Sequence, residues 1–312
     1  MSSIDQKGLF EQYYQVKYDF NTASLTAGEI LEIKTLVREK RVEYALAPMG
    51  TGVFNWILNK NSNIRFELVP FESEKIDGML YIPMSGKERA YIILNANKPL
   101  ANQVFTAAHE FYHYIKDYQR FKEKPYICDF GMLKDVNEKK ACRFAAELLL
   151  PEDALSHETQ EYCRIMNVKN VKQMGFNQIA TLIIVLTVKY QMPLKAVIYR
   201  LAEENCIDNV DKYIENYDFI KKVLLEIEIF RKQVDELYST ENDFVIPYNS
   251  TYQDMEKAYS AGNASKEDII SDAAKLGLNM NVVNDLFGVD DESEDDDDCD
   301  DELFAMINAK RG

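Results

Sequence analysis

The spacing of apolar and polar residues in the N-terminal third of the chain predicts helices followed by three short strands. Thr26 and Glu29 have the spacing of a capping box, and the segment after them keeps a helical period as far as Pro48. The apolar stretch VFNWILNK then predicts a short helix. Segments rich in β-branched and aromatic residues, with turn residues between them, predict strands at 64–71, 78–83 and 90–95. We expect these strands to form a small antiparallel sheet.

The remainder of the chain is mostly helical in pattern. Pro99 favours the start of a helix that runs through residues 106–118, and VNEKKACRFAAELLL predicts another that stops at Pro151. Further helices are expected at about 177–190, 194–205 and 210–238, and one capped by Ser265 that ends near Gly277. The helix expected at 210–238 has one apolar stripe that should pack on a neighbour or a partner, formed by Ile214, Tyr217, Ile220, Leu224, Ile227, Val234 and Leu237.

Composition places most of the chain among globular proteins. Hydrophobic residues make up 46% of the 312 positions, which is enough to bury a core. The longest apolar run, residues 179–188, is too short to span a bilayer, and the opening residues lack the basic and apolar regions of a secretory signal. The five cysteines include no CxxC pair, so free thiols in a reducing compartment are expected. We therefore expect a cytoplasmic protein without a membrane partner.

The charge of the chain is strongly acidic, with 52 acidic against 36 basic residues and a net charge of −16. Nucleic acid repels such a chain, so no direct nucleic-acid binding is expected, although residues 177–205 have the outline of a helix-turn-helix. Eleven carboxylates lie within residues 290–302, a block that we expect to be disordered and solvated. Two roles are considered for this tail: a solubiliser, or a flexible polyanion that holds a basic partner near the protein.

Candidate chemistry is concentrated in TAAHEFYHYIKDY, residues 106–118. His109 and His113 are four positions apart, so on a helix both imidazoles face the same way and can bind one metal ion. Glu110 is rotated by about 100° from His109 and can accept a proton from water without binding the metal. This spacing is typical of a zinc hydrolase, although two histidines that share a helix face by chance give the same pattern. The third histidine, His157, lies in a polar stretch and is expected at the surface.

A third zinc ligand is expected from the helix at 136–150, which carries Glu138 and Glu147. Nine residues correspond to about 900° of rotation, so the two glutamates lie on opposite faces and one orientation cannot bring both to the same ion. The face of Glu138 carries small residues, which allow the helix to lie close to the histidines, whereas the other face is bulky. We therefore predict Glu138 as the third ligand, with a solvated charge in the first turn of a helix as the alternative.

These segments together resemble the ImmA/IrrE family of zinc-dependent peptidases, in the gluzincin group. The resemblance is carried by FTAAHEFYHYI, by EKKACRFAAELLLP, which is similar to the family pattern ExxAxxFAAELLxP, and by IATLIIVLTVKYQMPLKAVIYRLAEENCI. It implies an α+β zincin-like fold with a bound Zn²⁺ ion. It also implies the metal ligands His109, His113 and Glu138, the catalytic acid and base Glu110, and a helix-turn-helix repressor as the substrate.

The resemblance covers about residues 25–207 and divides the chain into four parts. These are an N-terminal extension (1–25), the zincin-like peptidase domain (26–207), a mainly helical C-terminal region (208–288) and the acidic tail (289–312).

Some positions depart from what the resemblance implies. Phe111 and Tyr112 stand in place of a pair of small residues within the HExxH segment, where they either narrow the cleft or simply pack. Cys142 stands where many gluzincins have an aspartate that orients a histidine. Asp117, one turn beyond His113, is a candidate for this orienting role, or else an exposed helix charge.

Together these observations predict a zinc endopeptidase. Glu110 deprotonates a water molecule activated by the metal, the water attacks a peptide carbonyl, and Glu110 passes the proton to the leaving amine. The strand at 90–95 precedes the metal helix and is expected to border the cleft, where a substrate could add as an extra strand. The alternative is a non-catalytic module of the same fold that sequesters a regulator, for which Glu110 has no purpose.

Overall fold

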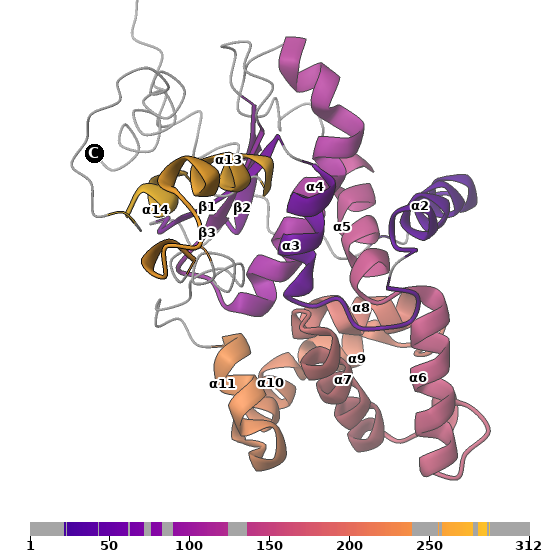
Figure 1. The fold of residues 1–312 in the computed structure, drawn as a ribbon. Coiled ribbons are helices and arrows are strands. Elements are labelled where there is room, and N and C mark those ends of the chain that lie inside the picture. The colour runs from indigo at the N-terminus through magenta and orange to yellow at the C-terminus, as the bar shows by residue number, and fades with distance from the viewer. Residues whose placement is uncertain are drawn as a thin grey trace, which may run out of the picture.

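A computed structural model of the chain describes residues 22, 24–42, 44–61, 63–71, 76–82, 90–123, 136–238, 255, 258–276, 280–285 and 287. The N-terminal extension, apart from a few residues before Thr26, and the acidic tail lie outside these described residues. The described part is α+β, as predicted. A three-stranded sheet is covered on one face by two helices, and further helices form a layer beyond them (Figure 1).

The sheet consists of β1 (Ile64–Val69), β2 (Gly78–Tyr81) and β3 (Ala90–Asn95), in the order β1–β3–β2. β3 pairs antiparallel with β2 but parallel with β1, so the expected antiparallel sheet is wrong for one of its two pairs. All six residues of β3 are buried, which suits a central strand, and its insertion between the two earlier strands makes β1 its parallel neighbour. Because both edges of β3 are paired, a substrate cannot add to it as an extra strand. Within the described residues, the free edge beside the helix at 100–123 belongs to β2.

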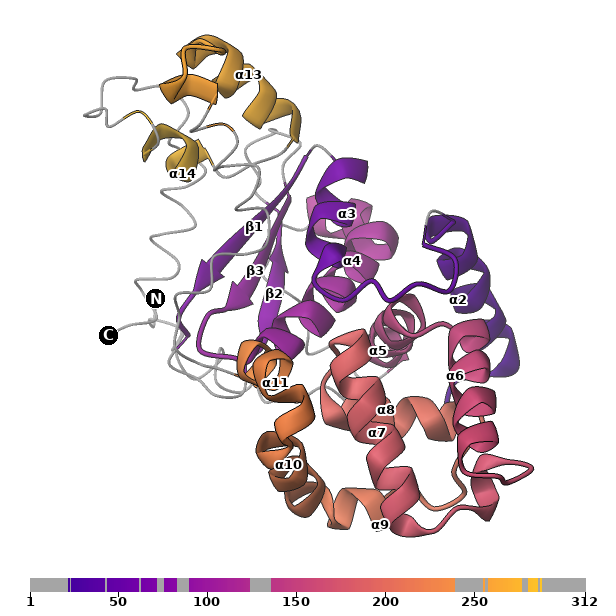
Figure 2. The same ribbon diagram turned by 60° about the horizontal axis from the view of Figure 1, so that its bottom comes forward.

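The first helix, α2 (Ala27–Lys40), begins at the expected capping box. The hydroxyl of Thr26 accepts a hydrogen bond from the N–H of Glu29, and the carboxylate of Glu29 accepts one from the N–H of Thr26. The next helix, α3 (Gly52–Lys60), corresponds to the apolar stretch expected to be helical. α3 packs against β1 and α4 (Leu100–Glu123), while α2 packs against α5 (Val136–Leu149). Figure 2 shows α3 and α4 on one side of the sheet, with α5 and α2 further from it.

The end of α2 differs from the sequence prediction. The helix stops at Lys40 instead of continuing to Pro48. Arg41 is buried, and its guanidinium donates hydrogen bonds to the carbonyls of Ala45 and Ala47. The turns after Lys40 supply two carbonyl acceptors to this buried cation, in addition to the carbonyl of Leu148, and a longer helix would not place those two there.

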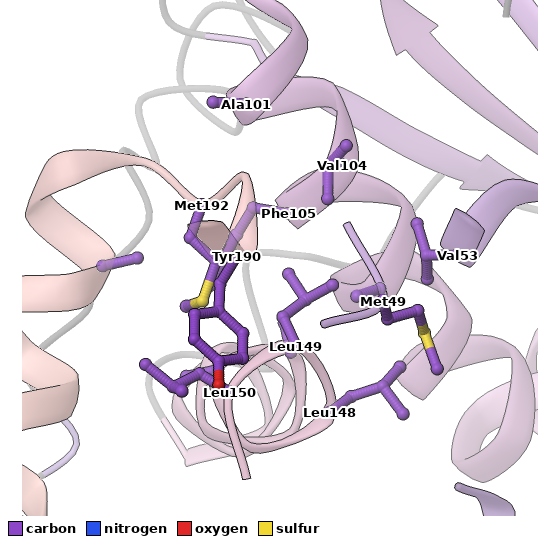
Figure 3. Close-up of a cluster of buried hydrophobic side chains, with 14 of the residues drawn as sticks. Met49, Val53, Ala101, Val104, Phe105, Leu148, Leu149, Leu150, Tyr190 and Met192 are labelled. Atoms are coloured by element: carbon purple, nitrogen blue, oxygen red, sulfur yellow. The ribbon is translucent and has the colours of Figure 1, made fainter. Parts of the chain in front are cut away.

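The helices α4 and α5 lie side by side, as the two motif-bearing segments were expected to do. Small residues at their contact are fully buried and allow the backbones to approach, among them Ala107, Ala108, Ala141 and Ala145. At the other end of this contact, Phe105 of α4 lies with Leu149 at the end of α5, with Leu150 directly after it, and with Tyr190 and Met192 (Figure 3). This apolar core fixes α4 relative to α5.

Helices make up the C-terminal half of the described chain. Their bounds are α6 (Glu152–Ile165), α7 (Phe176–Tyr190), α8 (Leu194–Glu203), α9 (Val210–Glu215), α10 (Tyr217–Glu226), α11 (Arg231–Tyr238), α13 (Lys266–Leu276) and α14 (Met280–Asp285), with short 3₁₀ turns η1 (Val171–Gln173) and η2 (Glu228–Phe230). α6 was not expected, because its sequence was read as a polar stretch. The cap of α13 is confirmed, since Ser265 and Asp268 exchange hydrogen bonds between side chain and backbone.

The long helix expected at 210–238 is broken into α9, α10 and α11. The backbone leaves the helical conformation at Asn216, and it is extended at Ile227. The breaks let the apolar stripe follow the surface of α7 and α4, where Ile220, Leu224 and Val234 are buried. The stripe thus packs on neighbours within the chain.

The pair α7 and α8 has a helix-turn-helix outline, with a bend of 112° between the helices. No residue of α8 is exposed, so this helix does not present the surface that a DNA-reading helix places in a groove. Among the described residues no single helix is long and apolar enough to cross a membrane, and only this bent pair meets the criteria of length and composition together.

Candidate metal centre

His109 and His113 lie on successive turns of α4 and point the same way, as their spacing predicts. Each is 1% exposed, and the centroids of the two rings are 5.0 Å apart. Their Nε2 atoms are separated by 3.3 Å. Two imidazole nitrogens therefore face one point beside the helix.

Glu138, in the first turn of α5, faces the same point. Its Oε2 lies 3.1 Å from Nε2 of His109, and its Oε1 lies 3.3 Å from Nε2 of His113. Ligand atoms of the three residues all lie within 4.8 Å of one another, which makes them a group that could hold a metal ion. The alternative of a solvated charge is wrong for Glu138, because its side chain is only 13% exposed.

Glu147 lies on the opposite face of α5 and has other partners. Its carboxylate accepts hydrogen bonds from Arg143 at 3.3 Å, from Arg200 at 2.7 Å and from the N–H of Glu152 at 2.9 Å. The two glutamates are thus separated as the rotation along the helix requires. Only Glu138 is near the histidines.

The Nδ1 atoms of the histidines also have partners. Nδ1 of His113 lies 3.0 Å from Oδ2 of Asp117, and Nδ1 of His109 lies 3.5 Å from Sγ of Cys142. Asp117 is 8% exposed, so the alternative of an exposed helix charge is wrong. Both rings are held from behind, with Nε2 directed at Glu138. Two imidazoles and one carboxylate are a donor set that catalytic zinc sites use, so these residues fit the metal.

The electrostatics of the cluster are dominated by burial and by its own charges. Burial disfavours the charge on Glu138, but His113 and His109 hold its pKa far below the ordinary glutamate value. Burial also disfavours protonation of His113, yet Glu138 and Asp117 raise the pKa of this imidazole to about 10. The carboxylates therefore attract positive charge to the histidines. A metal cation that replaces the proton meets the same demand.

Glu110 lies next to this cluster and is 3% exposed. Burial raises the pKa of its carboxyl, and a hydrogen bond from the backbone of Leu80 in β2 opposes that rise. Its Oε2 is buried and has no hydrogen-bond partner among the described residues. A buried carboxylate oxygen without a partner is costly, and it is typical of a group that meets its partner during function.

Phe111 and Tyr112 are buried, at 1% and 4% exposure, and pack against other aromatic rings. Phe111 lies edge-on to Trp56 at 5.5 Å, and Tyr112 lies 5.4 Å from Phe144, measured between ring centroids. Of the two alternatives for this pair, the structure supports packing. His157 is exposed on α6 and takes no part in the cluster.

Two contacts of the centre were missed by sequence reasoning. Cys142 was noted only as a departure, although its place four residues after Glu138 puts it on the same face of α5 and could have indicated a contact with His109. The backbone of Leu80 approaches Glu110 through the packing of β2 on α4, for which the sequence carries no signal.

The fold and the geometry together define a zincin-like domain, with an HExxH helix beside a small sheet and a glutamate from the next helix. Comparison with known families identifies residues 59–202 as an IrrE N-terminal-like domain of the Peptidase_M78 family, as the sequence resemblance to ImmA/IrrE peptidases indicated. The matched region contains the sheet, α4 and α5, and hence all four residues of the centre. No curated protein and no solved structure gave a match.

Proposed function

We propose that this protein is a zinc-dependent endopeptidase in which His109, His113 and Glu138 hold the metal and Glu110 is the catalytic acid and base. The observation that carries the proposal is the convergence of two Nε2 atoms and one carboxylate beside a buried Glu110 oxygen that no described residue hydrogen-bonds. The metallopeptidase family of residues 59–202 supports it.

Zinc, when bound, polarises the scissile carbonyl and makes water more acidic. Glu110 supplies the base, and the rise in its pKa on burial makes its carboxylate a stronger proton acceptor than an exposed glutamate. Glu110 then delivers this proton to the nitrogen of the leaving amine. Asp117 and Cys142 keep the two imidazole rings in a fixed orientation while the proton moves.

The proposed path of the substrate follows β2 instead of β3. β3 is paired on both sides, whereas β2 has a free edge within the described residues and touches α4 beside Glu110. An extended peptide can add to such an edge through its own backbone hydrogen bonds. The substrate class included in the proposal is a helix-turn-helix repressor in the cytoplasm, which the ImmA/IrrE resemblance implies.

Cleavage with and without metal tests this function. Purified protein is incubated with a helix-turn-helix repressor or with unfolded casein, with zinc or with a chelator, and fragments are identified by mass spectrometry. We expect fragments only with zinc. Glu161→Gln, at a half-exposed position of α6, serves as the matched control for Glu110→Gln. A complex with the repressor that forms without fragments, equally in wild type and Glu110→Gln, would support the sequestering module instead.

The acidic block 290–302 lies outside the described residues and is tested separately. If this polyanion holds the basic face of a repressor near the centre, deleting residues 289–312 leaves zinc content unchanged but slows cleavage at low ionic strength. Equal rates for the full and shortened chains across a salt series would leave the tail as a solubiliser.

A further inference from the structure

The two histidines of the centre are held from behind by different chemical groups. Nδ1 of His113 faces the carboxylate of Asp117 at 3.0 Å, within the same helix. Nδ1 of His109 faces the thiol of Cys142 at 3.5 Å, from the neighbouring helix α5. Cys142 is 2% exposed, so water does not compete for this contact. A sulfur atom therefore lies where it can hold the ring of His109 from the Nδ1 side.

The direction of this hydrogen bond decides whether His109 can bind a metal. A neutral imidazole carries one proton, and Nε2 can donate its lone pair to a metal only when that proton is on Nδ1. The Nδ1–H then donates to Sγ of Cys142, which is a weak acceptor. We propose that Cys142 is a positioning residue for His109, whose sulfur selects the ring orientation and tautomer that present Nε2 to the metal.

The place of Cys142 in the fold supports this role. It follows Glu138 by four residues, so both side chains lie on the face of α5 that meets α4. The helix α5 thus supplies Glu138 as a proposed ligand and Cys142 as the group that holds the other proposed ligand, His109. Cys142 is not itself placed to bind the ion, because its sulfur lies on the Nδ1 side of His109 while Nε2 faces Glu138.

The strength of the hydrogen-bond acceptor at position 142 should change the zinc affinity. Groups behind a ligand histidine change metal affinity by about 10–100-fold when they are removed, and a thiol belongs at the lower end of this range. A carboxylate accepts a stronger, charge-assisted hydrogen bond than a thiol does. Replacing the thiol by a carboxylate should therefore strengthen zinc binding, and replacing it by a methyl group should weaken it.

The test measures zinc affinity of the full chain by competition with a chromophoric chelator, under reducing conditions and with folding checked by circular dichroism. We expect Cys142→Ala to weaken zinc binding about tenfold. Cys142→Ser should weaken it by less than Cys142→Ala, and Cys142→Asp should bind zinc at least as tightly as wild type. Cys163→Ala, which removes another buried thiol on α6, is the matched control and should leave affinity unchanged. Cobalt absorption spectra should shift in the Cys142 variants and not in the control.

The inference is overturned if Cys142→Ala binds zinc as tightly as wild type, or if Cys142→Asp is as weak as Cys142→Ala. Should Cys142→Ala fail to fold, the comparison of Cys142→Ser with Cys142→Asp decides, because an acceptor role requires the aspartate variant to bind zinc more tightly than the serine variant. The inference rests on the proposed metal site. A His113→Ala arm separates the two, since a wild-type chain that binds no more zinc than His113→Ala refutes the site itself.

Discussion

Two buried polar clusters lie at opposite ends and on opposite faces of α5, and they differ in how their charges are balanced. The arginine–glutamate cluster consists of Arg143, Glu147, Arg200, Glu203 and Glu204. The histidine–glutamate cluster consists of His109, Glu110, His113 and Glu138. The first pairs its carboxylates with guanidinium groups, whereas in the second the carboxylate of Glu138 faces two histidines.

This difference separates a structural cluster from a binding site. Arg200 is fully buried, yet the neighbouring carboxylates, led by Glu147, raise the pKa of its guanidinium and keep it charged. In that cluster the positive charge comes from the arginines of the chain itself. In the histidine–glutamate cluster the positive charge must come from a proton on His113 or from a metal ion, and one oxygen of Glu110 has no hydrogen-bond partner in the part of the chain that the structure describes. A buried polar cluster that lacks fixed positive charge is the one that can take up a cation.

The largest expected effect comes from removing a histidine of the second cluster. His113→Ala should lower the zinc content from about one ion per chain to nearly none, because two of three ligands hold a catalytic zinc poorly. Elemental analysis of the purified, folded protein measures this. His157→Ala, on the surface of α6, is the control and should keep its zinc. Full zinc content in His113→Ala would show that the metal is elsewhere.

Glu110→Gln tests whether Glu110 acts as the base while the other residues of the same cluster bind the metal. It should keep the metal and lower the cleavage rate by about 10²–10⁴-fold, because it removes the base and leaves the ligands in place. Rates are measured with casein or a repressor and compared with Glu161→Gln. Loss of zinc in this variant would make Glu110 a ligand and reverse its assignment.

Replacing each of the two glutamates of α5 by alanine, in separate variants, compares the two clusters directly. Glu147→Ala should lower the free energy of unfolding by about 3–5 kcal/mol, because it removes a carboxylate that two buried arginines share, while the folded protein keeps its zinc. Glu138→Ala should lose zinc affinity and cost less stability in the metal-free protein. Urea unfolding and elemental analysis measure both quantities. If Glu147→Ala released the zinc and Glu138→Ala did not, the two clusters would have been assigned the wrong way round.

The smallest expected effect is a dependence of stability on pH in the metal-free protein. The pKa of His113 is about 10 when folded and about 6.5 when unfolded. Its protonation therefore stabilises the fold fully below pH 6.5, and this stabilisation is lost as the pH rises through 10. We expect the unfolding free energy, measured by urea titration with a chelator present, to fall over this window.

The arginine–glutamate cluster supplies the control for this pH dependence, because guanidinium groups stay charged throughout the window. His113→Ala should therefore lose the pH dependence between 6.5 and 10. A flat profile in the wild-type protein, or an unchanged slope in His113→Ala, would contradict the charge balance inferred for the histidine–glutamate cluster.

Features set by local spacing could be predicted from the sequence. The capping box at Thr26, the helix through His109 and His113, and the placement of Glu138 and Glu147 on opposite faces all follow from the geometry of a single helix. Patterns confined to one helix can be predicted from the sequence because residues close together along the chain determine them.

Features set by pairing between elements could not be predicted in the same way. Strand spacing did not reveal that β3 lies between β1 and β2, nor did periodicity reveal the bends that divide residues 210–238. The early end of α2 depends on carbonyl groups that Arg41 meets only once the chain has turned back. Each of these outcomes reflects a gain in burial or hydrogen bonding that an isolated segment does not have.

The candidate metal centre contains features of both kinds. The sequence determined the ligand types, their spacing on each helix and the choice of Glu138 through the small residues on its face. Only the tertiary structure decided that Cys142 stands behind His109 and that the backbone of Leu80 reaches Glu110. These contacts join residues about thirty positions apart in sequence. They arise from the close packing of α4 against α5 and β2, which the spacing of residues along the sequence does not specify.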